Sequence, residues 1–256
     1  MRQPGARKAV APFEVTLSDA DPVTDDTEYP GVGALVYTDV SGIIHVQCSA
    51  IEFDSTRILT AAHCFSATEC FTGIATAYAQ NSYRFVLGHS AVFPVSATPV
   101  VSWTIEDDFT PSTCAADLAI ATLVSSAPHA TGLLSPANIG PVAVGAEIVK
   151  VGYGWFSAHD DRSGELRPAG ERGRARMVVN APQDPERSPY YQYGPARNRD
   201  SQICTGDSGG PAFREVGDHR MLVGITSNGD VSGHCRTQPM DTALWSYRDW
   251  IVAHDR

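Results

Sequence analysis

Short strand-like runs separated by turn residues dominate this chain, and they limit its possible folds more than any other feature. About a dozen such runs recur at intervals of roughly 10–25 residues, bounded by Gly, Asp or Ser. The 22 glycines and 17 prolines are spread along the chain, which suits tight turns better than long helices. The pattern predicts an all-β sandwich or a pair of barrels. The clearest runs are residues 33–37, 43–47, 57–60, 84–87, 100–105, 118–124, 146–151, 175–179 and 221–226.

Four segments depart from this pattern. Residues 244–253 carry apolar side chains at i, i+1, i+3, i+6 and i+7, which predicts a single C-terminal helix. Residues 157–203 are rich in Arg, Asp, Pro, Gly and Tyr with little periodicity except around residues 175–179, so we interpret them mainly as solvated loops. Residues 1–28 are polar and suggest a partly ordered extension. A break over residues 125–136 would divide the 256 residues into two similar halves.

The net charge of −10 argues against nucleic acid or an anionic membrane surface as the main partner. No run approaches the roughly 18 consecutive apolar residues that a membrane-spanning helix needs. We therefore expect no nucleic-acid partner and no membrane association.

Six cysteines allow full pairing in several ways, and none of them forms a C-x-x-C pair. The spacing supports neither a zinc ribbon nor a thioredoxin-type redox site. Three disulfides would place the protein in an oxidising compartment. The first eight residues, however, lack the apolar segment of a signal peptide. Either a signal segment has been removed from this sequence, or its start is artificial or wrongly assigned.

A possible nucleophile lies in the hexapeptide GDSGGP at residues 206–211. A serine among glycines suits a sharp turn that exposes its hydroxyl and lets amide N–H groups converge on an oxyanion. The pattern also fits the nucleophile elbow of α/β-hydrolases, with Ser208, Asp230 or Asp241, and His254 as the catalytic set. An elbow must lead into a helix, though, and residues 209–211 (Gly-Gly-Pro) are poor helix formers.

A second arrangement places the base and the acid upstream of Ser208. His63 lies in LTAAHC at residues 59–64, and Asp117 begins DLAIATL at residues 117–123. With these three motifs in this order, the chain resembles the chymotrypsin-like (trypsin-fold) serine endopeptidases. The resemblance extends over about residues 29–254 and is weakest through 157–200. Further matching segments are YPGVG at 29–33, VGYG at 151–154 and GITSNG at 224–229.

The resemblance implies an all-β fold of two packed six-stranded antiparallel β-barrels (chymotrypsin-like) with a C-terminal helix. The first barrel would cover residues 29–130 and carry His63 and Asp117. The second would cover 131–243 and carry Ser208 and the substrate pocket. Residues 1–28 would be an N-terminal extension, and residues 244–256 would be the helix.

The resemblance also implies a role for each catalytic residue. Ser208 would attack the scissile carbonyl, and His63 would take its proton and later protonate the leaving amine. Asp117 would fix the imidazole tautomer and stabilise the imidazolium. The backbone N–H groups of Gly206 and Ser208 would form the oxyanion hole. The reaction would pass through an acyl-enzyme, with no cofactor and no metal.

The expected substrate pocket departs from that of trypsin-like members. Gln202 stands at the pocket floor, where those members carry an acidic residue, and Met240 stands at the opposite wall, where a glycine is common. An unpaired buried cation is costly, so we expect cleavage after uncharged, small-to-medium residues. An alignment shift of one would instead point Asp241 into the pocket and restore a preference for basic residues. The predicted substrate-binding residues are Gln202, Thr205, Ser227, Asn228, Gly229 and Met240.

For the cysteines, the family's bridges map to Cys48–Cys64 and Cys204–Cys235. Cys70 and Cys114 remain. If His63 and Asp117 touch, the loops carrying these two cysteines both border the cleft, so we predict a Cys70–Cys114 bridge.

Activation is a second departure from the family. Its zymogens are cut to free an N-terminal ammonium that pairs with the Asp before the nucleophile, here Asp207. No matching Ile/Val-Val-Gly-Gly tetrapeptide occurs in residues 1–30. Asp207 would then pair internally, for example with an arginine from residues 162–199, or the chain is a truncated or zymogen-like form.

Two functions therefore remain open. The first is a secreted, monomeric endopeptidase with protein or peptide substrates and protein protease inhibitors as partners. The second is a catalytically inactive protease-like binding protein or an unactivated zymogen.

Overall fold

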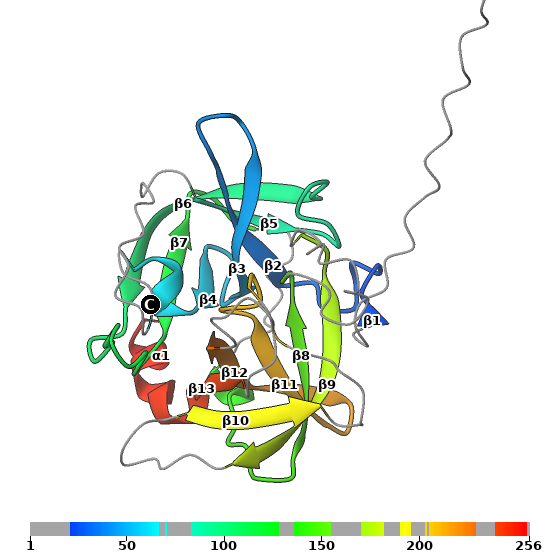
Figure 1. Cartoon of the computed structure of the whole chain (residues 1–256), viewed down its shortest axis with the longest axis vertical. Coiled ribbons are helices and arrows are strands. Elements are labelled where there is room, and N and C mark those ends of the chain that lie inside the picture. Colours follow the sequence, from blue (N-terminus) through cyan, green and yellow to red (C-terminus); the bar gives the residue numbers. More distant parts are fainter. Residues whose placement is uncertain are drawn as a thin grey trace, which may run out of the picture.

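The computed structural model describes residues 21–66, 70, 83–127, 136–154, 170–181, 190–195, 203, 205–228 and 239–254. Within these ranges the chain forms two β-barrels and a short C-terminal helix (Figure 1). The strands of residues 32–123 occupy the upper half of the view, and those of residues 147–243 occupy the lower half.

The first barrel closes in the order β2-β3-β4-β7-β6-β5, and every neighbouring pair is antiparallel. Strand β4 has the predicted bounds, and β2, β5 and β6 contain their predicted runs and are longer. Strand β3 starts one residue later than predicted and ends five residues later, and β7 is shorter by one residue at each end. The six strands are β2 (Val32–Thr38), β3 (Ile44–Glu52), β4 (Arg57–Thr60), β5 (Tyr83–Leu87), β6 (Ser96–Ile105) and β7 (Ala119–Leu123).

The second barrel follows the order β9-β10-β13-β12-β11-β8 and closes through the pairing of β8 with β9. A short strand, β1 (Asp21–Pro22), pairs antiparallel with the first two residues of β9. The two six-stranded antiparallel barrels are therefore confirmed. The six strands are β8 (Glu147–Gly152), β9 (Gly173–Ala181), β10 (Tyr190–Pro195), β11 (Pro211–Val216), β12 (His219–Asn228) and β13 (Met240–Ala243).

The apolar core runs from one barrel into the other. Val149 and Ile225 of the second barrel belong to the same buried cluster as Leu35 and Leu59 of the first. A smaller cluster, which includes Met177, fills the interior of the second barrel. Because one core spans both barrels, residues at their contact hold fixed positions relative to each other.

The predicted C-terminal helix is present, but it starts with a tighter turn. A 3₁₀ helix, η4 (Leu244–Tyr247), leads into α1 (Arg248–Ala253). Leu244 and Ile251 are buried and fix the helix on the core. Among the described residues, no helix has the length and apolar character to cross a membrane.

The strand predicted at residues 175–179 is confirmed as β9, which starts at Gly173. The interpretation of residues 157–203 as mainly loops is wrong over residues 190–195, which form β10, a full member of the second barrel. Tyr191 and Tyr193 of β10 are buried in the barrel, whereas Gln192 between them is half-buried. The two-residue alternation is hard to see in the sequence, because the buried positions carry tyrosines, which have a polar hydroxyl, and not aliphatic residues. Most of the expected break at 125–136 lies outside the described residues.

Candidate active site

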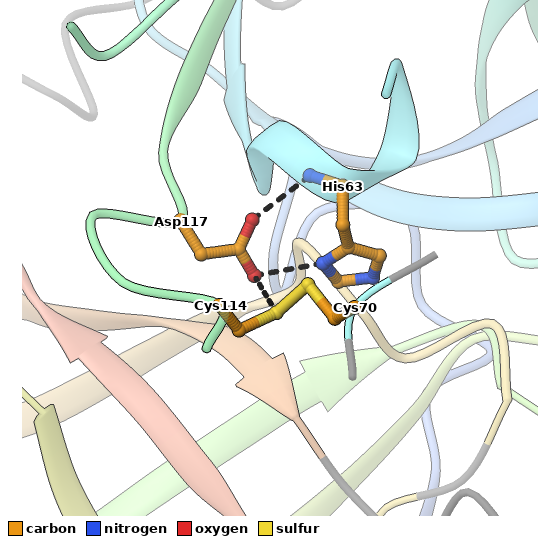
Figure 2. Close-up of side chains that lie close together, drawn as sticks. All are labelled: His63, Cys70, Cys114 and Asp117. Carbon is orange, nitrogen blue, oxygen red and sulfur yellow. Dashed lines mark hydrogen bonds and ion pairs between the residues drawn. A yellow bond between two sulfur atoms is a disulfide. The ribbon is translucent and has the colours of Figure 1, made fainter. Parts of the chain in front are cut away.

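His63 and Asp117 are joined by two hydrogen bonds. His63 lies in η1 (Ala62–Cys64), the single turn that follows β4. Its backbone N–H donates to Asp117 Oδ1 at 2.9 Å, and its Nδ1 lies 2.7 Å from Asp117 Oδ2. The Asp117 side chain is fully buried, while the His63 side chain is 18% exposed. A buried carboxylate thus fixes the ring of a histidine that solvent reaches (Figure 2).

The second barrel also contributes to the environment of Asp117. Ser227 of β12 donates its Oγ–H to Asp117 Oδ2 at 2.7 Å. Thr242 of β13 donates its Oγ–H to the backbone carbonyl of Asp117 at 3.0 Å. These hydrogen bonds compensate for the burial of the carboxylate, which would otherwise be costly. They also tie the loop before β7 to the neighbouring barrel.

The loop that carries Asp117 has unusual backbone geometry. Cys114 and Ala116 have φ values of 56° and 54°, in the left-handed region that residues with a side chain rarely adopt. Such conformations cost of order 1–3 kcal/mol and persist only where surrounding contacts enforce them. Here those contacts include the Asp117 hydrogen bonds and the disulfide of Cys114.

Ser208 lies in a sharp turn between two glycines with positive φ, Gly206 at 97° and Gly209 at 77°. Ser49 of β3 holds this turn from the first barrel. Its backbone N–H donates to the Ser208 carbonyl at 2.7 Å, and its Oγ–H donates to the Gly206 carbonyl at 2.8 Å. The same Oγ accepts the N–H of Tyr153 at 2.9 Å.

The turn packs directly against the segment that leads to His63. A Cβ at Gly209 would collide with Thr60 Oγ1 and with the Ser49 carbonyl, and it would lie 3.1 Å from the backbone nitrogen of Ala61. The residue next to Ser208 is therefore in van der Waals contact with the chain two residues before His63. Only a glycine permits this approach at this φ.

Two disulfides flank His63. Cys48 bridges to Cys64, with a Cα–Cα distance of 6.2 Å, and Cys70 bridges to Cys114, with a Cα–Cα distance of 5.3 Å. Both pairings are those that the sequence predicts. The Cys114 sulfur lies 3.7 Å from Asp117 Oδ2 (Figure 2). The expected Cys204–Cys235 bridge lies outside the described residues.

Comparison with protein families gives a match over most of the chain. The family model described as Trypsin matches residues 24–251. The chain belongs to the trypsin family. Family membership supports a serine-type peptidase acting on protein or peptide substrates, and trypsin-family proteases are commonly secreted.

The structure describes four of the six residues expected to bind substrate in this trypsin-family fold. Thr205 is exposed beside the Ser208 turn, and Ser227 is buried. Asn228, the last residue of β12, is the register partner of Met240 in β13. Met240 also receives the Nε2–H of Gln192 from β10, 3.8 Å from its sulfur. Gln202 and Gly229 lie outside the described residues.

Asp207 faces the end of β8. Its Oδ1 accepts the N–H of Gly154 at 2.8 Å, and a Cβ at either Gly152 or Gly154 would collide with its carboxylate. Two glycines in VGYG thus make room for this side chain. The three described arginines of residues 162–199 make ion pairs elsewhere, with Asp26 for Arg172, Glu28 for Arg174, and Glu147 and Glu215 for Arg176.

A buried ion pair that was not predicted from the sequence joins β8 to β13, the strand that begins at Met240. Lys150 of β8 places its Nζ 2.6 and 2.7 Å from the two carboxylate oxygens of Asp241, which also accepts the Tyr191 hydroxyl at 2.7 Å. The Lys150 ammonium lies 5.1 Å from the centre of the Tyr193 ring. Burial lowers the pKa of Lys150, although the Asp241 carboxylate opposes that shift, and burial raises the pKa of Tyr191.

A sequence signal for this pair does exist. Lys150 interrupts the apolar run at residues 146–151 and is one of two lysines in the chain. A charge inside a buried strand requires a partner. Ser49 and Thr242, by contrast, are ordinary hydroxyl residues on strands, and nothing in their neighbourhoods distinguishes them.

Proposed function

We propose that this trypsin-family protein is a serine endopeptidase that uses Ser208, His63 and Asp117 as its catalytic triad. The observation that carries the proposal is the fully buried Asp117 carboxylate, which accepts hydrogen bonds from the backbone and the ring of His63 and from Ser227. Such a carboxylate fixes one imidazole tautomer, with the proton on Nδ1 and the lone pair on Nε2. His63 is thereby prepared to act as a base.

In the proposed reaction, the Nε2 atom of His63 takes the Ser208 proton as Oγ attacks the scissile carbonyl. The imidazolium is stabilised by Asp117 and then protonates the leaving amine, which yields an acyl-enzyme. Water, activated by the same Nε2, hydrolyses the acyl-enzyme. The backbone N–H groups of Gly206 and Ser208 bind the oxyanion, each contributing about 3–4 kcal/mol to transition-state stabilisation.

For specificity we propose cleavage after uncharged, small-to-medium residues. A preference for basic residues would require an unneutralised carboxylate in the pocket, and the Asp241 carboxylate already binds the Lys150 ammonium. Met240 is half-buried, lies opposite Asn228 in register and contacts Gln192, and we expect it to narrow the pocket on this side. A peptide library in which Arg or Lys dominates the position before the cut would contradict this preference.

The Cys48–Cys64 and Cys70–Cys114 bridges support a secreted protein that folds in an oxidising compartment. The −10 net charge is compatible with an extracellular enzyme that does not bind nucleic acid.

A serine-directed fluorophosphonate probe tests the catalytic proposal. We expect one covalent label on folded wild-type protein and none on Ser208→Ala. Ser41→Ala is the matched control, because Ser41 is exposed in the turn between β2 and β3 and should leave labelling unchanged. Folded wild type that stays unlabelled would refute the proposal for this form of the chain. If limited proteolysis then restored labelling, the chain would be a precursor. If it did not, the protein would be a binding protein.

A further inference from the structure

The Cys70–Cys114 bridge lies against the His63–Asp117 pair. Each of these four residues offers one potential ligand atom: the two cysteine sulfurs, an imidazole nitrogen of His63 and a carboxylate oxygen of Asp117. These four atoms all lie within 4.8 Å of one another. Figure 2 shows the four side chains converging from η1, from Cys70 and from the loop before β7. The bridge thus holds two sulfurs at the place where the catalytic base and acid meet.

We propose that reduction of the Cys70–Cys114 bridge creates a zinc site made of both thiolates, His63 and Asp117, and that zinc bound there takes the histidine out of catalysis. Two thiolates, an imidazole and a carboxylate are typical zinc ligands. In a tetrahedral site with bonds of about 2.0–2.3 Å, the ligand atoms are about 3.4–3.8 Å apart. Since the ligand atoms now lie within 4.8 Å of one another, no pair would need to approach by more than about 1.4 Å, while the two sulfurs separate once their bond is broken.

The two bridges beside His63 differ in accessibility. Cys70 is half-buried, whereas Cys48 and Cys64 are each 1% exposed. Thiol–disulfide exchange needs direct access of the attacking thiolate to a sulfur atom. A dithiol reductant should therefore open Cys70–Cys114 before Cys48–Cys64.

The zinc site would form in two steps, reduction of the bridge and then binding of zinc. A dithiol transfers two electrons and two protons to the bridge and leaves as its own disulfide, so that Cys70 and Cys114 become thiols. Zinc then displaces the two thiol protons. If His63 binds zinc through Nδ1, its proton moves to Nε2, which can no longer accept the Ser208 proton. If His63 binds through Nε2, the lone pair itself is occupied. Both modes remove the base.

The protein already supplies hydrogen bonds that would orient the carboxylate ligand. The His63 backbone N–H donates to Asp117 Oδ1, and Ser227 donates to Oδ2. Outer hydrogen bonds of this kind orient ligating carboxylates and strengthen metal sites. The inhibitory effect rests on the proposed function, but zinc binding itself does not.

The test is a zinc titration of the full chain in both redox states. Protein is reduced anaerobically with a dithiol and desalted, the opened bridge is identified by alkylation and peptide mapping, and zinc chloride is added in competition with a chromophoric chelator. We expect about one zinc per reduced chain and none per oxidised chain over the same range. With Co²⁺ in place of zinc, the reduced chain should show thiolate charge-transfer and tetrahedral d–d absorption.

Two variants identify the ligands. The Cys70→Ser/Cys114→Ser variant should lose the site after the same treatment, and His63→Gln should weaken it at least about tenfold. Equal binding by the double-serine variant would overturn the proposal and point to Cys48, His63 and Cys64, whose ligand atoms also cluster. Unchanged binding by His63→Gln would overturn it too. If reduction unfolds the wild type, Cys70→His keeps three ligands and adds an imidazole without reductant, and its failure to bind zinc would refute the proposal.

Fluorophosphonate labelling separates the two proposals. Zinc should block labelling of reduced wild type and leave oxidised wild type labelled. Labelling that persists with zinc bound would overturn the inhibitory role. If even the oxidised chain is never labelled, the proposed peptidase fails while the zinc titration still decides the metal site.

Discussion

Replacing Asp241 by Asn removes the only negative charge that directly contacts the Lys150 ammonium among the described residues. Both side chains are buried, at 2% exposure for Lys150 and 0% for Asp241, so the lysine cannot turn to water without disturbing the barrel. Breaking a buried pair by removing one partner costs about 3–5 kcal/mol. The loss of stability has an upper limit, because Lys150 can lose its proton instead of staying charged. Deprotonating a lysine with the ordinary pKa of 10.5 at pH 7 costs about 5 kcal/mol.

Because Lys150 can lose its proton, the free energy of unfolding of Asp241→Asn should depend on pH. If Lys150 is neutral in the folded variant and charged in the unfolded chain, the unfolded chain binds one more proton. The free energy of unfolding should then rise by about 1.4 kcal/mol per pH unit, from pH 7 towards the unfolded pKa of 10.5. The wild type should show a weaker slope of the same sign, because burial lowers the pKa of Lys150 while Asp241 opposes the shift.

The assay is equilibrium unfolding in urea between pH 7 and 10, with all variants in a Ser208→Ala background to prevent self-cleavage. Glu147→Gln is the matched control, because Glu147 lies on the same strand as Lys150 but pairs with Arg176 at the surface, with both side chains more than half exposed. Its loss should change stability by no more than about 1 kcal/mol. The Lys150→Met/Asp241→Asn variant keeps an acceptor for the Tyr191 hydroxyl and should be more stable than Asp241→Asn. A loss below about 1 kcal/mol in Asp241→Asn at pH 7, without a pH slope, would refute the reasoning.

Two further predictions concern the Asp117 carboxylate and the Glu106 side chain. Ser227→Ala removes the Oγ donor to Asp117, so kcat/KM on a peptide substrate should fall about tenfold or more, since such a bond contributes about 1.5–3 kcal/mol; an unchanged value would contradict this. Burial raises the pKa of Glu106 above 4.5, so its stabilising contribution is present below pH 4.5 and is lost as pH rises through the folded value. Glu106→Gln should flatten this decline in Tm; a variant with the wild-type pH profile would contradict it.

The strands that could be predicted from sequence are those whose apolar residues recur locally. Residues 57–60 and 118–124 are rich in Ile, Leu, Val and Ala, and they appear as β4 and β7. Strand β13 could not be found in this way, because Met-Asp-Thr-Ala places a charged residue at its centre. That charge is tolerated only because Lys150, 91 residues away, neutralises it. A pairing at such a distance leaves no local periodicity.

The same distinction between local and distant signals applies to the candidate site. The three motifs place His63, Asp117 and Ser208 in the sequence because their flanking residues are distinctive. The residues that hold them, such as Ser49 and Thr242, act through single hydroxyl groups whose partners are known only once both barrels are folded. A serine or threonine on a strand has the same local pattern whether it faces solvent or a catalytic loop.

The position of Ser49 explains why the site needs both barrels. From β3 of the first barrel, Ser49 forms hydrogen bonds with the Ser208 and Gly206 carbonyls of the Ser208 turn and with the N–H of Tyr153 after β8. In the opposite direction, Ser227 and Thr242 of the second barrel bond Asp117 of the first. Apolar contacts across the shared core have little directionality, so they could hold the barrels together in several registers. Hydrogen bonds with fixed partners on both sides select one register, and in that register the turn of Ser208 packs against the segment leading to His63.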